Sequence, residues 1–109
     1  MEISTAVTTF AALAQETRLL ALKELVKAGE SGLAAGVLGE RLGVPNNTLS
    51  FHLGHLSKAG IVRAEKKGRS IIYRANFDTM IALINYLAAD CCSEESARVE
   101  VSDSEGATT

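Results

Sequence analysis

The sequence contains no tryptophan, few other aromatic residues and only two cysteines. Two cysteines are too few to cross-link a small secreted domain, so a disulfide scaffold is excluded. No apolar run approaches the length of about 18 residues that crosses a bilayer, and the start MEISTAVTTF lacks the pattern of a signal peptide. We therefore expect a cytoplasmic protein with reduced thiols and no membrane partner.

Aromatic scarcity also limits how the core is built. Aromatic residues make up 5% of the chain and hydrophobic residues 47%, so Leu, Ile, Val and Ala must supply most of the core. This composition favours helices packed on helices. A chain of 109 residues predicts one domain with a small core, which a partner subunit would stabilise.

Charge divides the chain unevenly. Residues 1–89 hold ten Lys and Arg against seven Asp and Glu, whereas residues 90–109 hold one Arg against six acids. We expect a folded domain over residues 1–92 and an acidic, disordered tail over 93–109. Within the folded part, one 17-residue stretch has Glu65 as its only acid and contains six cations: Lys58, Arg63, Lys66, Lys67, Arg69 and Arg74. Such a stretch is either a solvated face or a site for a polyanion.

Helical periodicity runs through most of the chain. It predicts helices over residues 3–13, 16–28, 33–42, 46–58 and 77–92. Apolar residues line one face of the second helix: Leu19, Leu22, Leu25 and Val26. The last helix has a wider apolar face than one small core can bury: Phe77, Met80, Ile81, Ile84, Leu87 and Ala88. This excess favours a dimer seam between helices.

The segment after the third helix predicts a helix-turn-helix followed by a β-hairpin. Pro45 suits the start of the fourth helix, whose first turn Asn46 or Asn47 can cap. After Gly60, the β-prone runs IVRAE and SIIYRA are joined by KKGR, which places a basic tip on the hairpin. The expected fold is therefore mainly α: a winged helix-turn-helix of about five helices and a two-stranded wing.

The fourth helix has a narrow buried face and a polar exposed one. Leu49, Leu53 and Leu56 share one stripe, and the other face carries hydrogen-bonding groups without a carboxylate. A helix enters the major groove only with such a face. The DNA-binding candidates are Asn46, Asn47, Thr48, Ser50, Phe51, His52, His55 and Lys58 on the helix, and Lys66, Lys67 and Arg69 on the wing.

Less specific interpretations remain open. The two helices can be an ordinary αα-hairpin whose exposed helix is polar, and His52, at the edge of the leucine stripe, can hydrogen-bond within the fold. A purely protein-binding winged helix is a further alternative. Enzyme activity is not expected, because the sequence has no Cys-x-x-Cys, no Ser/His/Asp set and no phosphate-cradling glycine loop.

The segment LGERLGVPNNTLSFHLGHLSKAGIVRAEKKGRSIIYRA resembles the winged-helix core of the ArsR/SmtB family of bacterial metalloregulatory repressors, and AQETRLLALKELVKAG resembles that family's preceding helix. The resemblance covers about residues 10–92. It implies a homodimer formed through the first and last helices, which binds a palindromic double-stranded operator and is released by an effector. No cofactor is required for binding DNA.

The effector sites of the family differ, and only one has matching residues here. The segment GLAAGVLGERL lacks Cys, His and Asp, and the last helix has Asp78 and Asp90 but no histidine. Adjacent Cys91 and Cys92 can chelate a soft ion, and they resemble the Cys-Cys pair of arsenic-responsive members. The inducer implied is trivalent arsenic, as arsenite or an organoarsenical. No third cysteine follows; the alternatives are a redox switch and two packed, structural thiols.

Overall fold

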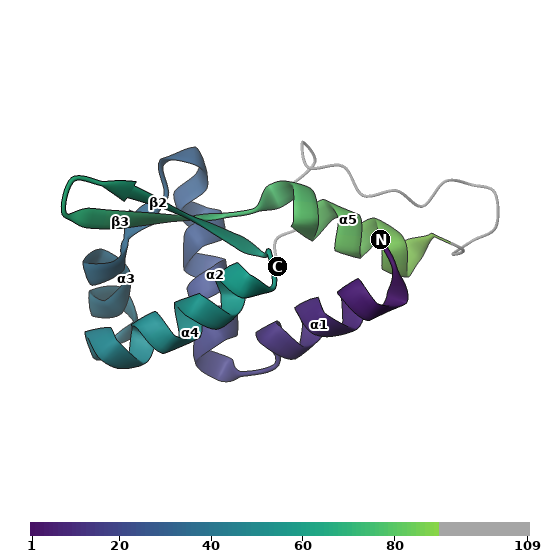
Figure 1. Cartoon of the computed structure of the whole chain (residues 1–109), viewed down its shortest axis with the longest axis horizontal. Helices are drawn as coiled ribbons and strands as arrows, with labels where there is room; N and C mark the ends of the chain where they lie inside the picture. Colours follow the sequence, from purple (N-terminus) through teal and green to yellow (C-terminus); the bar gives the residue numbers. More distant parts are fainter. Residues whose placement is uncertain (90–109) are drawn as a thin grey trace. The chain divides into compact units, whose positions relative to one another are not determined.

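The computed structural model describes residues 1–89, which fall into two units that are considered separately (Figure 1). Residues 2–76 form the larger unit, with the helices α1 (Ile3–Leu13), α2 (Glu16–Ala28), α3 (Ala35–Leu42) and α4 (Asn46–Lys58) and the strands β1 (Leu33–Ala34), β2 (Val62–Lys67) and β3 (Ser70–Ala75). The smaller unit carries α5 (Phe77–Ala88). The predicted fold, mainly helical with a β-hairpin after a helix-turn-helix, is confirmed.

Local interactions explain where the helices begin and end. The side chain of Gln15 caps α2, because its Oε1 accepts a hydrogen bond from the Arg18 backbone N–H at 2.8 Å. Pro45, rather than an asparagine, is the N-cap of α4 and has an extended backbone. Asn47 nevertheless satisfies one donor of the first turn, since its Oδ1 accepts from the Thr48 backbone N–H at 2.9 Å. The helix bounds predicted for α1, α2 and α4 are therefore correct.

The sheet has a third strand that the sequence did not predict. Residues 33 and 34, expected to be helical, form β1 and pair antiparallel with β3, with Leu33 opposite Tyr73 and Ala34 opposite Ile72. The hairpin of β2 and β3 is in register from Val62↔Ala75 to Lys67↔Ser70, and the strand order is β1-β3-β2. The base of the wing is thus three-stranded, whereas its tip is a two-stranded ribbon.

Two further contacts fasten the wing to the segment between α2 and α3. Arg74 donates a hydrogen bond from Nε to the backbone oxygen of Glu30 at 2.8 Å. Gly32 lies directly against β3, where a Cβ atom at this position would lie 2.5 Å from the backbone oxygen of Tyr73. These contacts and the β1–β3 pairing make the wing base continuous with the helix-turn-helix.

The core of the larger unit is made of aliphatic side chains from several elements. Its largest fully buried side chains include Leu25, Leu38, Leu49, Leu53, Leu56 and Ile61. The predicted leucine stripe of α4 is therefore confirmed. On α2, Leu22 and Leu25 are buried as expected, but Leu19 is 46% exposed, so the inward face of this helix is centred nearer Ala21 than the pattern predicted.

Helix α5 has an apolar surface of its own. Leu83, absent from the predicted face, is its buried residue, whereas Ile84 and Leu87 are exposed. The helix ends at Ala88 with a turn at residue 89, short of the predicted end at 92. Residues 90–92, including Cys91 and Cys92, and the predicted tail 93–109 lie outside the described residues. Over residues 1–89, no helix is long and apolar enough to cross a membrane.

Candidate nucleic-acid interface

Helix α4 presents one continuous polar face. Its three buried residues, Leu49, Leu53 and Leu56, fix the orientation of the helix, so the remaining positions point outward or to the edge. The exposed side chains include seven of the predicted contacts: Asn46, Asn47, Thr48, Ser50, Phe51, His55 and Lys58. The helix contains no acidic residue, so nothing on it repels a phosphate backbone.

An aromatic pair occupies the middle of this face. Phe51 is 62% exposed and meets the ring of His55 edge-on, with ring centroids 4.7 Å apart and an interplanar angle of 76°. The spacing of four residues brings these two rings together on one side of the helix. Phe51 offers an apolar contact of the kind that thymine methyl groups make, and His55 offers a hydrogen-bonding ring beside it.

His52 takes a different position from the other α4 candidates. It is half-buried, and the Arg18 guanidinium of α2 contacts its Nδ1 with an N–N distance of 3.4 Å. Burial, together with the charges of Arg18 and His55, holds the pKa of His52 below its ordinary value of 6.5. This arrangement favours the interpretation that His52 links α4 to α2 within the fold.

The wing supplies the cations. Lys66 and Lys67 end β2 and Arg69 lies in the turn, and all three are exposed. Among the described residues none of them forms an ion pair within 4.0 Å. By contrast, Arg74 donates a hydrogen bond to the carboxylate of Glu65 at 2.5 Å, and this ion pair links β3 to β2. That hydrogen bond, with the charge of Lys67, holds the pKa of the Glu65 carboxyl below its ordinary value.

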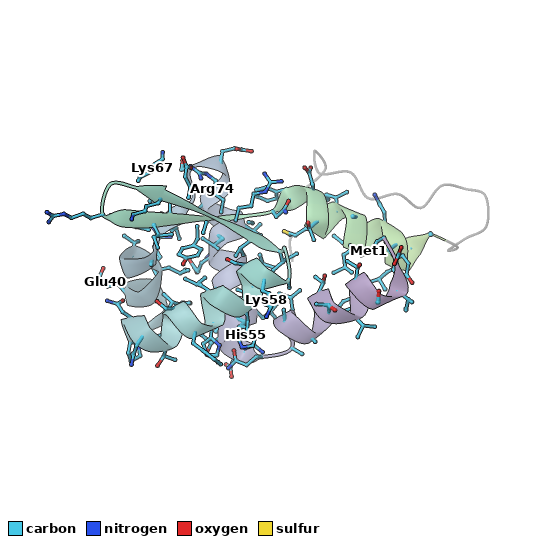
Figure 2. The ribbon with its side chains drawn as sticks, in the orientation of Figure 1. Met1, Glu40, His55, Lys58, Lys67 and Arg74 are labelled. Carbon is cyan, nitrogen blue, oxygen red and sulfur yellow. The ribbon has the colours of Figure 1, made fainter. Side chains whose placement is uncertain are left out.

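The larger unit brings the helix and the wing together around a shared hollow. Asn46 and Ser50 of α4 and Arg69 of the wing line one space of about 320 Å³, together with Ser70 and Tyr73. Figure 2 labels three further candidates that do not line this hollow: His55 and Lys58 on α4, and Lys67 on the hairpin. Two of the predicted helix contacts, Asn46 and Ser50, and one predicted wing contact, Arg69, therefore face a common space.

Ser70 and Tyr73, which line the shared hollow, were not among the predicted residues, and neither was Arg18, which contacts His52. Ser70 lines the shared hollow and could have been found from the sequence, because it follows Arg69 at the basic tip. Arg18 has no sequence signal, since 34 residues separate it from His52. Its Nε also donates to the backbone oxygen of Ala12 at 2.6 Å, so one guanidinium joins the end of α1 to α4.

Metal ligands are a separate question. Within residues 1–89, no three His, Cys, Asp or Glu side chains are grouped so that they could hold a metal ion. The predicted pair Cys91 and Cys92 lies outside that range.

Several known proteins that this chain resembles are transcriptional regulators. A helix-turn-helix domain model matches residues 13–65. An ArsR-like transcriptional regulator from Rhodococcus sp. RHA1 is 34% identical, with a TM-score of 0.69 over 79% of this chain and 78% of that one. The biofilm growth-associated repressor of Xylella fastidiosa is 31% identical over 76% of this chain and 70% of its own length.

A third similarity concerns assembly. A homodimeric winged helix-turn-helix DNA-binding domain from Mycobacterium bovis, Mb0332, is 25% identical, with a TM-score of 0.66 over 90% of each chain. These relatives are regulators rather than enzymes, which confirms that enzyme activity is not expected. The order of elements, the carboxylate-free helix and the wing, together with these similarities, show that the chain belongs to the ArsR family of winged helix-turn-helix transcriptional regulators.

Proposed function

We propose that this protein is a cytoplasmic, homodimeric transcriptional repressor that binds a palindromic operator. Helix α4 lies in the major groove, and the wing tip follows the phosphate backbone or the adjacent minor groove. Asn46, Asn47, Thr48, Ser50, Phe51 and His55 are the candidates for base and phosphate contacts. Lys58, Lys66, Lys67 and Arg69 neutralise phosphates.

The observation that carries this proposal is the shared hollow between α4 and the wing. Asn46 and Ser50 line it from the helix and Arg69 lines it from the wing, so a duplex seated on α4 also meets the cationic tip. The alternative interpretation, a polar αα-hairpin followed by an unrelated basic loop, does not explain why these groups line the same hollow. Asn and Arg side chains are also the ones that read adenine and guanine edges.

Dimerisation is supported by apolar surface on two helices. On α1, Ile3, Val7 and Phe10 follow a helical spacing and are 66%, 58% and 42% exposed. On α5, Ile84 and Leu87 are 36% and 62% exposed. A partner subunit that covers these residues removes apolar area from water, and the homodimeric relative from M. bovis has the same fold.

The effector we propose is trivalent arsenic, as arsenite or an organoarsenical, bound by Cys91 and Cys92. This part rests on the sequence, because two adjacent thiols suit a soft ion and both lie outside the described residues. Ligation next to the dimer-forming helix α5 changes the separation of the two α4 helices. Half-sites one helical turn, about 34–36 Å, apart do not tolerate that change.

The test is binding of the reduced protein to its own upstream DNA, followed by fluorescence anisotropy. Arsenite, phenylarsine oxide and zinc are titrated into complexes of the wild type and of a Cys91→Ser/Cys92→Ser variant. We expect the arsenicals to release DNA from the wild type alone. Release that persists in the variant contradicts the cysteine site, and release by oxidants alone points to a redox effector. Failure to bind any duplex with a steep salt dependence refutes the repressor itself.

A further inference from the structure

A second hollow, separate from the one between α4 and the wing, lies between α1 and the C-terminal half of α4. It has a volume of about 350 Å³ and is lined by Thr8, Ala11, Ala12, Arg18, His55, Lys58 and Ala59. All of these residues belong to the larger unit, in which α1 contacts both α2 and α4. The volume is at the small end of the range for pockets that hold small molecules.

The walls and the polar groups of this hollow have distinct characters. Ala11, Ala12 and Ala59 present methyl groups, whereas Arg18, His55 and Lys58 present nitrogen donors. None of the seven lining residues is acidic. An apolar wall with a few convergent donors and cations is the chemistry that binds an anion attached to an apolar body.

Arg18 is positioned before any ligand arrives. Its Nε donates to the Ala12 backbone oxygen at 2.6 Å, and its Nη1 contacts His52 Nδ1 at 3.4 Å. A guanidinium carries five N–H donors, so these contacts leave about three of them unused by the described residues. The side chain therefore keeps a fixed orientation and retains donors for a carboxylate.

Lys58 and His55 connect this hollow to the proposed DNA-binding face. Both side chains are exposed on α4, and both are candidates for contacts with the operator (Figure 2). Within residues 1–89, Lys58 forms no ion pair within 4.0 Å. A ligand in the hollow that pairs with Lys58 neutralises its charge. That cation is then no longer available to a DNA phosphate on the exposed face of α4.

We infer that this hollow binds a small organic carboxylate with an apolar body, and that the bound anion excludes DNA from His55 and Lys58. The second half of the inference rests on the proposed operator binding by α4. A DNA phosphate is the alternative occupant, but a phosphodiester is polar on its exposed side and leaves the alanine walls uncovered. An organic anion satisfies both the walls and the donors.

The probes for binding are benzoate and hexanoate, with benzamide as the uncharged counterpart of benzoate and inorganic phosphate as the wholly polar anion. Each is titrated into the full chain to about 10 mM, so that binding much weaker than micromolar is also detected. Amide chemical shifts in the ¹H–¹⁵N spectrum report the site. We expect benzoate and hexanoate to shift Ala11, Ala12 and Ala59, and benzamide and phosphate to leave them in place.

Three variants separate the walls from the charge. Ala11→Leu fills the hollow at an exposed helical position, and we expect it to abolish benzoate binding but retain DNA binding. Lys58→Gln is expected to weaken benzoate by about tenfold, as loss of one charged hydrogen bond does, and to weaken DNA as well. Lys66→Gln, on the wing, is the matched charge control; it weakens DNA and leaves benzoate affinity unchanged. A urea melt of each variant verifies that it is folded.

The outcomes distinguish the inference from the proposed function. No shift from either carboxylate, or benzoate binding that survives Ala11→Leu, overturns the site. Phosphate binding as strong as benzoate binding overturns the organic ligand in favour of a phosphate contact. Benzoate that binds without displacing operator DNA overturns the competition. A chain that binds benzoate but no duplex refutes the repressor and the competition, while its carboxylate site stands confirmed.

Discussion

Gly32 offers the sharpest test of how the wing is attached to the rest of the fold. Its backbone has φ 67° and ψ −170°, a conformation that other residues adopt at a cost of about 1–3 kcal/mol. A Cβ atom there would also lie 2.5 Å from the Tyr73 backbone oxygen and 2.8 Å from Arg74 Cγ. Overpacking of this kind costs about 1–3 kcal/mol. We therefore expect Gly32→Ala to lower the free energy of unfolding by about 2–6 kcal/mol.

Gly29→Ala is the matched control. Gly29 has φ 68° and ψ −146°, nearly the same backbone conformation, but a Cβ atom there meets nothing within 4 Å. Its substitution is expected to cost only the conformational part, about 1–3 kcal/mol. The difference between the two variants isolates the contact between Gly32 and β3.

Urea denaturation followed by circular dichroism, at one fixed protein concentration, measures both losses. Operator affinity, measured under conditions in which each variant is folded, should fall more for Gly32→Ala. The reason is that Gly32 contacts β3, which is one of the two strands of the wing. Equal losses of stability, within about 0.5 kcal/mol, would refute the argument, since measured effects at independent positions vary by that much.

Three further predictions concern the interface and the core. Lys66→Gln should reduce the slope of log K against log salt by about 1 and weaken binding to all duplexes equally; an unchanged slope contradicts a phosphate contact. The native pKa of His52 lies below 6.5, so the unfolded chain binds more protons just below that pH. Stability should therefore fall as the pH drops below 6.5, and urea midpoints from pH 7.5 to 5.5 should show a smaller fall in His52→Gln. Leu53 is fully buried, and Leu53→Ala should lower the free energy of unfolding by about 2–5 kcal/mol in the same assay. A loss below about 1 kcal/mol would contradict its place in the core.

The sequence predicted the helices well where short-range chemistry decides them. The bounds of α2 and α4 follow from Gln15, Gly29 and Pro45, which act within one or two turns of the chain. The exposed face of α4 was equally predictable, because three leucines at helical spacing leave only one side for the polar residues. Hydrophobic period and helix ends need no knowledge of the rest of the fold.

Long-range features could not be predicted in this way. Strand β1 has two residues, too few for any alternating pattern, and it forms because β3 offers it a partner 38 residues later, at Ala34↔Ile72. Leu19 has the same apolar character as Leu22, yet it is 46% exposed, because packing against other elements decides which apolar positions face inward. The contact of Arg18 with His52 likewise depends on how α2 and α4 cross.

The three-stranded base and two-stranded tip of the wing divide the element between two kinds of constraint. Residues 72 and 73 are tied to β1, and Arg74 is tied to Glu30 and Glu65, so substitutions there disturb the fold. Lys66, Lys67 and Arg69 lie beyond these ties, in a ribbon that only β2 and β3 form. Substitutions at the tip can therefore change its charge and the DNA that it prefers without disturbing the fold. The base meanwhile keeps the tip at a fixed distance from α4.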